Sequence, residues 1–238
     1  MTQGSMKNIL ITSSGFLLEP IRKEIVNFLP RSERLSAAYI PTASRVVKDD
    51  TYARRDVEIM QKLGMNVSEI DLSEFKEEEL EARIREHTFM YVQGGNPYWL
   101  LKQMRASGFD KIAHRLLAEA MPYIGKSAGA YILAPEVVVP TWYESDWGRF
   151  DVTDLKGMGE VPFVWAAHFD PSNERMLNDI QRGMKETPYP VRAITNTQAL
   201  LVRGENAQMV GEGKEYDLYH ERFNEGDMRP PREGWMNM

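Results

Sequence analysis

Short apolar runs alternate with amphipathic stretches along the first half of the chain. Residues 7–14, KNILITSS, are rich in β-branched side chains, as is typical of a buried strand. In residues 18–29 the apolar side chains recur with helical spacing, which predicts a helix with one buried face. The alternation continues, with strands predicted at 34–42, 66–72, 88–95 and 122–125 and helices at 50–63, 73–87, 97–106, 110–120 and 127–133.

This alternation predicts an α/β fold with a doubly wound, mostly parallel sheet and helices on both faces. The second half differs, because a strand at 161–169 and a helix at 170–184 precede three strand-like runs joined by short turns. We expect these runs, within 191–213, to form an antiparallel meander near the C-terminus. Ser73 is predicted to cap the helix at 73–87, and Pro171 to lie in the first turn of the helix at 170–184.

We expect residues 1–238 to form a single domain, since no repeat, linker or low-complexity block divides them. Residues 1–5 are interpreted as a cloning scar, and residues 221–238, which are polar and rich in Pro and Gly, as a loose tail. No apolar run approaches the ~20 residues that span a bilayer, and the N-terminus has no secretory signal pattern. The expected location is the cytoplasm, with no membrane partner.

Composition narrows the possible chemistry. The net charge of −6 argues against a general nucleic-acid binder, which needs a basic surface to replace counterions. The 238 residues include no cysteine, so disulfides, zinc–thiolate sites and a cysteine nucleophile are excluded.

One turn carries a chemical signature. Gly125 to Gly129, GKSAG, matches the G-x-S-x-G nucleophile elbow and lies between a predicted strand and a predicted helix. Glycines fit a turn that is too sharp for side chains. Ser127 would expose its hydroxyl at the amino end of a helix, where N–H groups stabilise negative charge. A plain turn with a serine cap is the structural alternative.

His168 is the best candidate for the base that a serine nucleophile needs. It ends the apolar run VPFVWAA and precedes a helix, at the strand edge where open α/β sheets bind ligands. A core histidine bonded to a carbonyl is the structural alternative. The positions of the other histidines do not indicate a catalytic role: His87 lies at a charged helix end, His114 on a helix and His220 in the polar end region.

A carboxylate is expected to orient the imidazole. The residues alone do not choose among the acidic candidates between Ser127 and His168, which are Glu136, Glu144, Asp146, Asp151, Asp154 and Glu160. Glu144 and Asp146 lie in the polar–aromatic stretch TWYESDWGRFD, a plausible wall for a small pocket.

A second glycine turn, Gly94-Gly95-Asn96, follows the strand at 88–95. The N–H of Gly95 and that of Ala128 would together form an oxyanion hole. A plain turn in which Asn96 caps the next helix is the alternative. Ser127 and His168 are only 168 − 127 = 41 positions apart, which leaves little room for the α/β-hydrolase fold, so a different sheet is expected.

Three stretches in order, GGNPYWLLKQM, YIGKSAGA and AAHFDPS, resemble the dipeptidase E (aspartyl dipeptidase) family, which includes the cyanophycinase relatives. The likeness covers about residues 7–218. It implies a fold like that of class I glutamine amidotransferases, with serine in place of cysteine at the elbow. It also implies Ser127 as nucleophile, His168 as base, and Gly95 and Ala128 as oxyanion donors.

The resemblance also suggests which acid completes the triad. The family's acid is an aspartate some twenty residues before the histidine, and Asp146 fits best at 168 − 146 = 22. The segment between Ser127 and Asp146 is longer than in dipeptidase E, so Glu144 is the fallback.

By the same resemblance the protein is a serine hydrolase of small peptides, acting through an acyl-enzyme on dipeptides with an N-terminal aspartate, without metal or organic cofactor. Asn96, Lys126 and Arg149 are the predicted substrate contacts; a lysine or arginine can bind an acidic side chain, although the family has an aromatic residue where Lys126 stands. A cyanophycinase-like hydrolase of β-linked aspartyl peptides and a non-enzymatic metabolite-binding module are the alternatives. The expected partner is a small peptide, and no oligomeric state is predicted.

Overall fold

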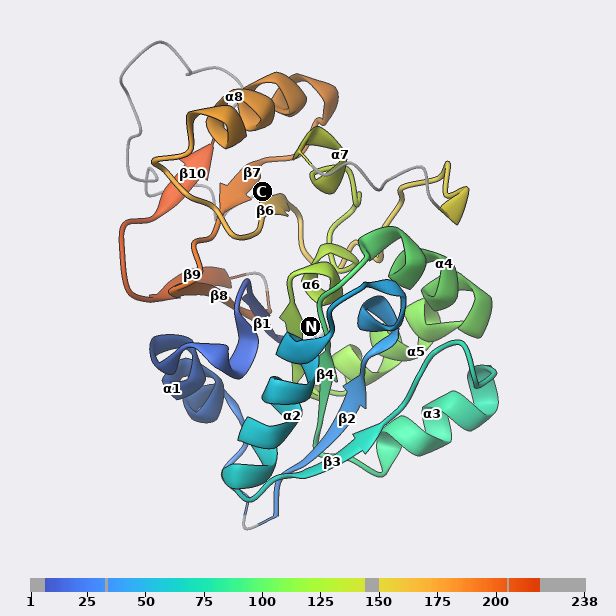
Figure 1. Ribbon diagram of the computed structural model, residues 1–238. Helices are drawn as coiled ribbons and strands as arrows, with labels where there is room; N and C mark the ends of the chain where they lie inside the picture. Colours follow the sequence, from blue (N-terminus) through green and yellow to red (C-terminus); the bar gives the residue numbers. More distant parts are fainter. Residues whose placement is uncertain (1–6, 33, 144–149, 205, 219–238) are drawn as a thin grey trace, which may run out of the picture.

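A seven-stranded sheet forms the centre of the computed structural model, which describes residues 7–32, 34–143, 150–204 and 206–218 (Figure 1). The strand order is β3-β2-β4-β5-β1-β8-β9. The first five strands in this order are parallel, and β8 and β9 run antiparallel to their neighbours. The strands are β1 (Asn8–Thr12), β2 (Ser36–Ile40), β3 (Asn66–Glu69), β4 (Phe89–Val92), β5 (Tyr123–Lys126), β8 (Gln198–Arg203) and β9 (Asn206–Gly211). The predicted doubly wound, mostly parallel sheet is confirmed.

Helices cover both faces of this sheet (Figure 1). Successive side chains of a strand point to opposite faces, so Ile9 and Ile11 join a core with α3, α4 and α5, while Leu10 joins a second core with α1 and α2. The helices are α1 (Glu19–Phe28), α2 (Thr51–Lys62), α3 (Glu77–Arg85), α4 (Pro97–Ser107), α5 (Phe109–Ala118), α6 (Ala128–Tyr131), α7 (Pro140–Tyr143) and α8 (Glu174–Gly183), with 3₁₀ turns at Gly15–Leu17, Thr42–Val46 and Met184–Glu186.

A smaller sheet has the order β10-β7-β6 and lies under α8 (Figure 1). Its strands are β6 (Val164–Ala166), β7 (Val191–Ala193) and β10 (Tyr216–Leu218). β7 is parallel to β6 and antiparallel to β10. The predicted meander is therefore wrong in its first strand, since only β8 and β9 form a hairpin. The strand-like run 191–195 and the short turn after it predicted a strand, but they carry no information about which strand is its partner.

Two helices begin later than predicted. The N–H and hydroxyl of Ser73 donate to Asp71 Oδ1 at 3.0 and 2.9 Å, so Ser73 closes a turn and α3 starts at Glu77. This local bonding competes with helix capping. Pro171 precedes α8, whose N-cap is Asn173 with its Oδ1 accepting from Met176 N–H at 3.1 Å.

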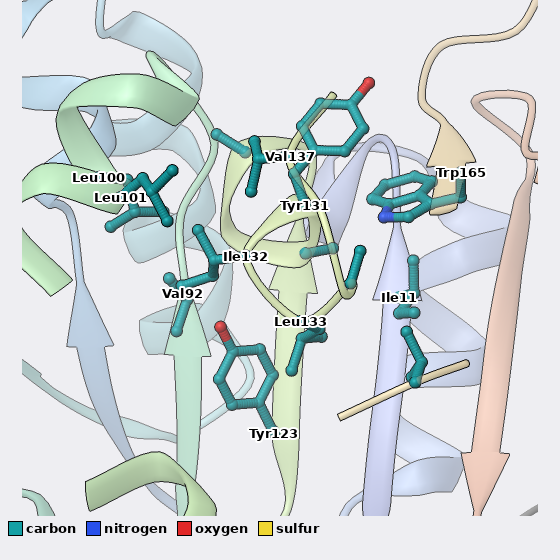
Figure 2. Close-up of a cluster of buried hydrophobic side chains, with 14 of the residues drawn as sticks. Ile11, Val92, Leu100, Leu101, Tyr123, Tyr131, Ile132, Leu133, Val137 and Trp165 are labelled. Carbon is teal, nitrogen blue, oxygen red and sulfur yellow. The ribbon is translucent and has the colours of Figure 1, made fainter. Parts of the chain in front are cut away.

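Apolar side chains fill the space behind the turn after β5. Figure 2 shows Val92, Tyr123 and Ile11 on three neighbouring strands, with Ile132 and Leu133 packed over them. Tyr131 lies beside Trp165 of β6, with ring centroids 4.9 Å apart. The two sheets therefore share one core at this point. Among the described residues, no helix is both long and apolar enough to cross a membrane.

Candidate active site

Ser127 lies in a strained turn between β5 and α6. Its backbone angles are φ 47° and ψ −112°, a conformation that non-glycine residues rarely adopt. Its N–H donates to the carbonyl of Thr12 at 2.8 Å, which ties the turn to the end of β1. Its own carbonyl accepts from Ala130 and Tyr131 and starts α6. The backbone therefore holds the hydroxyl at the carboxyl end of the parallel strands.

The two glycines of the elbow are sterically required. A Cβ at Gly125 would lie 2.7 Å from Ala130 Cα, and one at Gly129 only 2.0 Å from the carbonyl oxygen of Val92. Real Cβ atoms do not approach backbone this closely. The steric reason for glycine on both sides of the serine therefore holds in the structure.

His168 faces the serine from the second sheet. Its Nε2 lies 3.1 Å from Ser127 Oγ. It follows the end of β6 with φ 54°, and its N–H donates to Ser13 Oγ at 3.0 Å. The structure thus brings the predicted nucleophile and the predicted base within hydrogen-bond distance.

The side-chain amide of Asn196 is the third group beside Ser127 and His168. His168 Nδ1 lies 2.7 Å from Asn196 Oδ1. An amide oxygen only accepts hydrogen bonds, so Nδ1 carries the proton and Nε2 presents its lone pair to the serine hydroxyl. This is the tautomer that a general base requires.

The packing of β6 against β7 explains why Asn196 is close to His168. The two strands are parallel neighbours with Ala166 paired to Ala193, so the residues that follow them meet at the same edge. The carbonyl of Asn196 also accepts from the hydroxyl of buried Ser14 at 2.7 Å. Asn196 was not predicted, because the expected partner of His168 was a carboxylate between Ser127 and His168. A polar residue just after the strand at 191–195 was the available signal.

The predicted acids do not provide this contact in the described part of the chain. Asp146 and Glu144, and with them Arg149, lie outside the described residues. Glu160 is buried and binds His114 Nδ1 at 2.8 Å and Lys7 Nζ at 2.7 Å. Two further acids are engaged elsewhere: Asp154 with Arg105, and Glu136 with Thr187.

The surroundings keep His168 neutral to lower pH than usual. Protein atoms around the ring displace water and lower the pKa of His168 below its ordinary value of 6.5. The hydrogen bond that His168 donates to Asn196 acts in the opposite direction, and the positive charge of Lys126 lowers the pKa further. His168 as a whole residue is nevertheless exposed at the protein surface. A neutral imidazole at pH 7 is ready to accept a proton.

Two backbone N–H groups lie beside the serine. A Cβ at Gly94 would be 3.1 Å from Ser127 Cβ, so the glycine turn packs directly on the elbow. Gly95 has φ 144°, and a Cβ there would lie 2.1 Å from the carbonyl oxygen of Ala43. Among the described residues, the N–H groups of Gly95 and Ala128 find no acceptor, which leaves both for a ligand oxygen.

Two predicted substrate contacts have other partners. The ammonium of Lys126 is buried and lies 2.7 Å from the buried carboxylate of Asp56. The prediction that Lys126 contacts the substrate is therefore wrong, and the residue forms a buried ion pair instead. The chain turns at Ser127, which is half-buried and faces His168, and the side chain of the preceding residue points inward. Asn96 Oδ1 accepts from Tyr98 and Trp99 N–H at 3.0 and 2.9 Å and caps α4, the alternative foreseen for it. In the described part of the chain, no three His, Asp or Glu side chains gather in a way that could hold a metal ion.

Known proteins with similar sequences and structures are peptidases by name. The sequence matches peptidase family S51 over residues 9–210. An uncharacterized peptidase of Listeria innocua is 30% identical over 205 residues, covering 84% of this chain and 94% of the relative. A Drosophila melanogaster protein classed as an alpha-aspartyl dipeptidase is 24% identical, covering 87% and 88%. A crystal structure of a Listeria monocytogenes protein assigned to peptidase E superposes with a TM-score of 0.75 at 25% identity, covering 87% of this chain and all of that one.

Proposed function

The chain belongs to peptidase family S51 and is a serine-type peptidase, and from this premise we propose that it hydrolyses small peptides with Ser127, His168 and Asn196 as its catalytic group. The observation that carries the proposal is the 3.1 Å approach of His168 Nε2 to Ser127 Oγ. A serine hydroxyl is a weak nucleophile unless an adjacent base accepts its proton. The acceptor that Asn196 provides for His168 Nδ1 and the lowered pKa of His168 support the role of the imidazole as this base.

The reaction runs through an acyl-enzyme. Ser127 Oγ attacks the peptide carbonyl carbon while its proton passes to His168 Nε2, and the carbonyl oxygen becomes negatively charged. The N–H groups of Gly95 and Ala128 stabilise this oxyanion. His168 then protonates the amine of the leaving residue as the C–N bond breaks. Water, deprotonated by the same imidazole, attacks the ester, and Ser127 regains its proton.

Asn196 orients the imidazole but gives it no charge partner. A carboxylate would hold the ring in the same way and would also stabilise the imidazolium. The amide of Asn196 therefore orients the imidazole as a carboxylate would, but it leaves the histidine less basic than a carboxylate would. We infer that activity extends to lower pH than it would with a carboxylate at this position.

We propose dipeptides with an N-terminal aspartate as substrates, supported by the similarity to a protein classed as an alpha-aspartyl dipeptidase. Hydrolysis of Asp-Leu, β-Asp-Leu, Asn-Leu and Ala-Leu tests the preference. The pair Asp-Leu and Asn-Leu differs only in one charge, and we expect kcat/KM to favour Asp-Leu by at least about tenfold, or 1.4 kcal/mol. Equal rates for the two would reject the charge preference, and faster cleavage of β-Asp-Leu would favour β-linked substrates instead.

Ser14→Ala is expected to lower kcat several-fold and stability by about 1 kcal/mol, because the carbonyl of Asn196 loses the hydroxyl of buried Ser14 as its donor. The looser turn would hold the amide less well against His168. Steady-state kinetics and urea unfolding measure the two effects. Ser73→Ala is the matched control, since Ser73 also bonds through its hydroxyl but lies before α3. Comparable losses of kcat in both variants would reject the link between Ser14 and the site.

A further inference from the structure

The N–H of Gly95, one of the two proposed oxyanion donors, belongs to a peptide group whose carbonyl oxygen accepts a hydrogen bond from a tyrosine. Tyr52, on α2, is half-buried, and its hydroxyl donates to the carbonyl oxygen of Gly94 at 3.2 Å. That carbonyl and the N–H of Gly95 are the two ends of a single planar trans peptide. In a trans peptide the C=O and the N–H point to opposite sides. Fixing the oxygen on one side therefore fixes the direction in which the Gly95 N–H points.

The tyrosine ring is itself held in place. Lys126 Nζ lies 5.0 Å from the centre of the Tyr52 ring, within reach of a cation–π interaction. The same ammonium lies 2.7 Å from Asp56 Oδ2, and both side chains are buried. The lysine just before the nucleophile thus packs against the tyrosine that contacts the glycine turn.

The preceding peptide is held by the same cluster. Asp56 Oδ2 accepts from Gln93 Nε2 at 2.8 Å, and Gln93 Oε1 accepts from the N–H of Gly94 at 2.7 Å. The next peptide is also fixed, because the N–H of Asn96 donates to the carbonyl of Ala43 at 2.8 Å. Side chains and backbone therefore leave the Gly94–Gly95 peptide little freedom to rotate.

The hydroxyl of Tyr52 is a donor throughout the working pH range. Burial and nearby acidic residues raise the pKa of Tyr52 to about 12. A hydrogen bond to a peptide oxygen also polarises that peptide and strengthens its N–H as a donor, by roughly 10–30%. The Tyr52 hydrogen bond thus both orients the Gly95 N–H and makes it a stronger donor.

We propose that Tyr52 is a positioning residue of the oxyanion hole, holding the Gly94–Gly95 peptide so that the Gly95 N–H meets the oxyanion formed at Ser127. The inference rests on the proposed function, because the Gly95 N–H acts as an oxyanion donor only if Ser127 attacks a carbonyl group. The interaction strengthens as negative charge develops on the substrate oxygen. Loss of the hydroxyl therefore acts on kcat and leaves KM almost unchanged.

Tyr52→Phe tests the proposal, because it removes the hydroxyl and keeps the ring under Lys126. With Asp-Leu as substrate, kcat is expected to fall roughly tenfold while KM stays within about twofold. The boronic acid analogue of aspartate, which forms a charged tetrahedral adduct with a serine, is expected to bind more weakly by a similar factor. Thermal unfolding checks that the variant folds.

Ser107→Ala is the control. Ser107 is buried and its hydroxyl donates to the carbonyl of Met104, also at 3.2 Å, at the end of α4 that is farther from the glycine turn. We expect kcat of this variant to stay within about twofold of the wild type. Wild-type kcat and boronate affinity in Tyr52→Phe, or equal losses in Tyr52→Phe and Ser107→Ala, would overturn the inference. Activity in Ser127→Ala would instead overturn the proposed function itself.

Discussion

Replacing Ser127 with alanine is expected to lower kcat by about 10⁴-fold or more and to leave the fold intact. The change removes the hydroxyl that attacks the substrate, whereas the remaining N–H groups and the binding surface give only residual acceleration. Alanine meets the same backbone strain as serine at φ 47°, so the elbow has no new reason to rearrange. Steady-state hydrolysis of the dipeptide that the wild type cleaves fastest gives the activity, and urea unfolding gives the stability.

Ser68→Ala is the control for this variant. Ser68 is exposed on β3, the edge strand farthest from β9 in the sheet, and it contributes nothing to the group around His168. Its alanine variant should hydrolyse the substrate at the wild-type rate. Turnover by Ser127→Ala within about tenfold of the wild type would contradict a nucleophilic role.

The second large effect is expected at Asn196, where two substitutions separate geometry from charge. Asn196→Ala removes the acceptor for His168 Nδ1–H, frees the imidazole to rotate and should lower kcat about 100-fold. Asn196→Asp keeps an acceptor and adds a negative charge. The charge stabilises the imidazolium and so raises the pKa of His168.

The pH profile of kcat/KM measures the difference. The neutral imidazole is the active form, so activity is lost as the pH falls through the pKa of His168. In the wild type this acidic limb should have its midpoint below 6.5, since burial and Lys126 lower that pKa. In Asn196→Asp the midpoint should move to higher pH by about one unit.

Asn206→Asp serves as the charge control. Asn206 is exposed and pairs with Arg203, which pairs with Asn8 at the start of β1, the opposite end of that strand from Ser13. Its profile should match that of the wild type. An acidic limb that stays in place in Asn196→Asp would show that residue 196 does not contact the titrating imidazole.

The elbow and the histidine were predictable because each depends on a local pattern. Gly125 and Gly129 flank Ser127 for a steric reason, and the five consecutive residues 125–129 show this pattern in the sequence. His168 follows an apolar strand, and parallel strands end at the same edge. The sequence also predicted the parallel sheet, because its strands are apolar runs separated by amphipathic helices.

The third member of the group was not predictable in the same way. It depends on the pairing of β6 with β7, and the sequence was interpreted as placing 191–195 in a meander with 198–203. An expected carboxylate also directed attention away from an amide. The inward direction of Lys126 depends likewise on a tertiary partner, Asp56, seventy positions earlier. Such contacts follow from topology, whereas spacing along the chain does not reveal them.

Active-site labelling tests the central claim most directly. A fluorophosphonate forms a covalent bond with a serine only when a base activates the hydroxyl and an oxyanion hole accepts the phosphoryl oxygen. Incubation of the full-length protein followed by mass spectrometry should find one adduct per chain, on the peptide that contains Ser127, and none in Ser127→Ala. An adduct on a different residue, or an unlabelled protein that still hydrolyses peptides, would contradict the assignment of Ser127 and His168 as nucleophile and base.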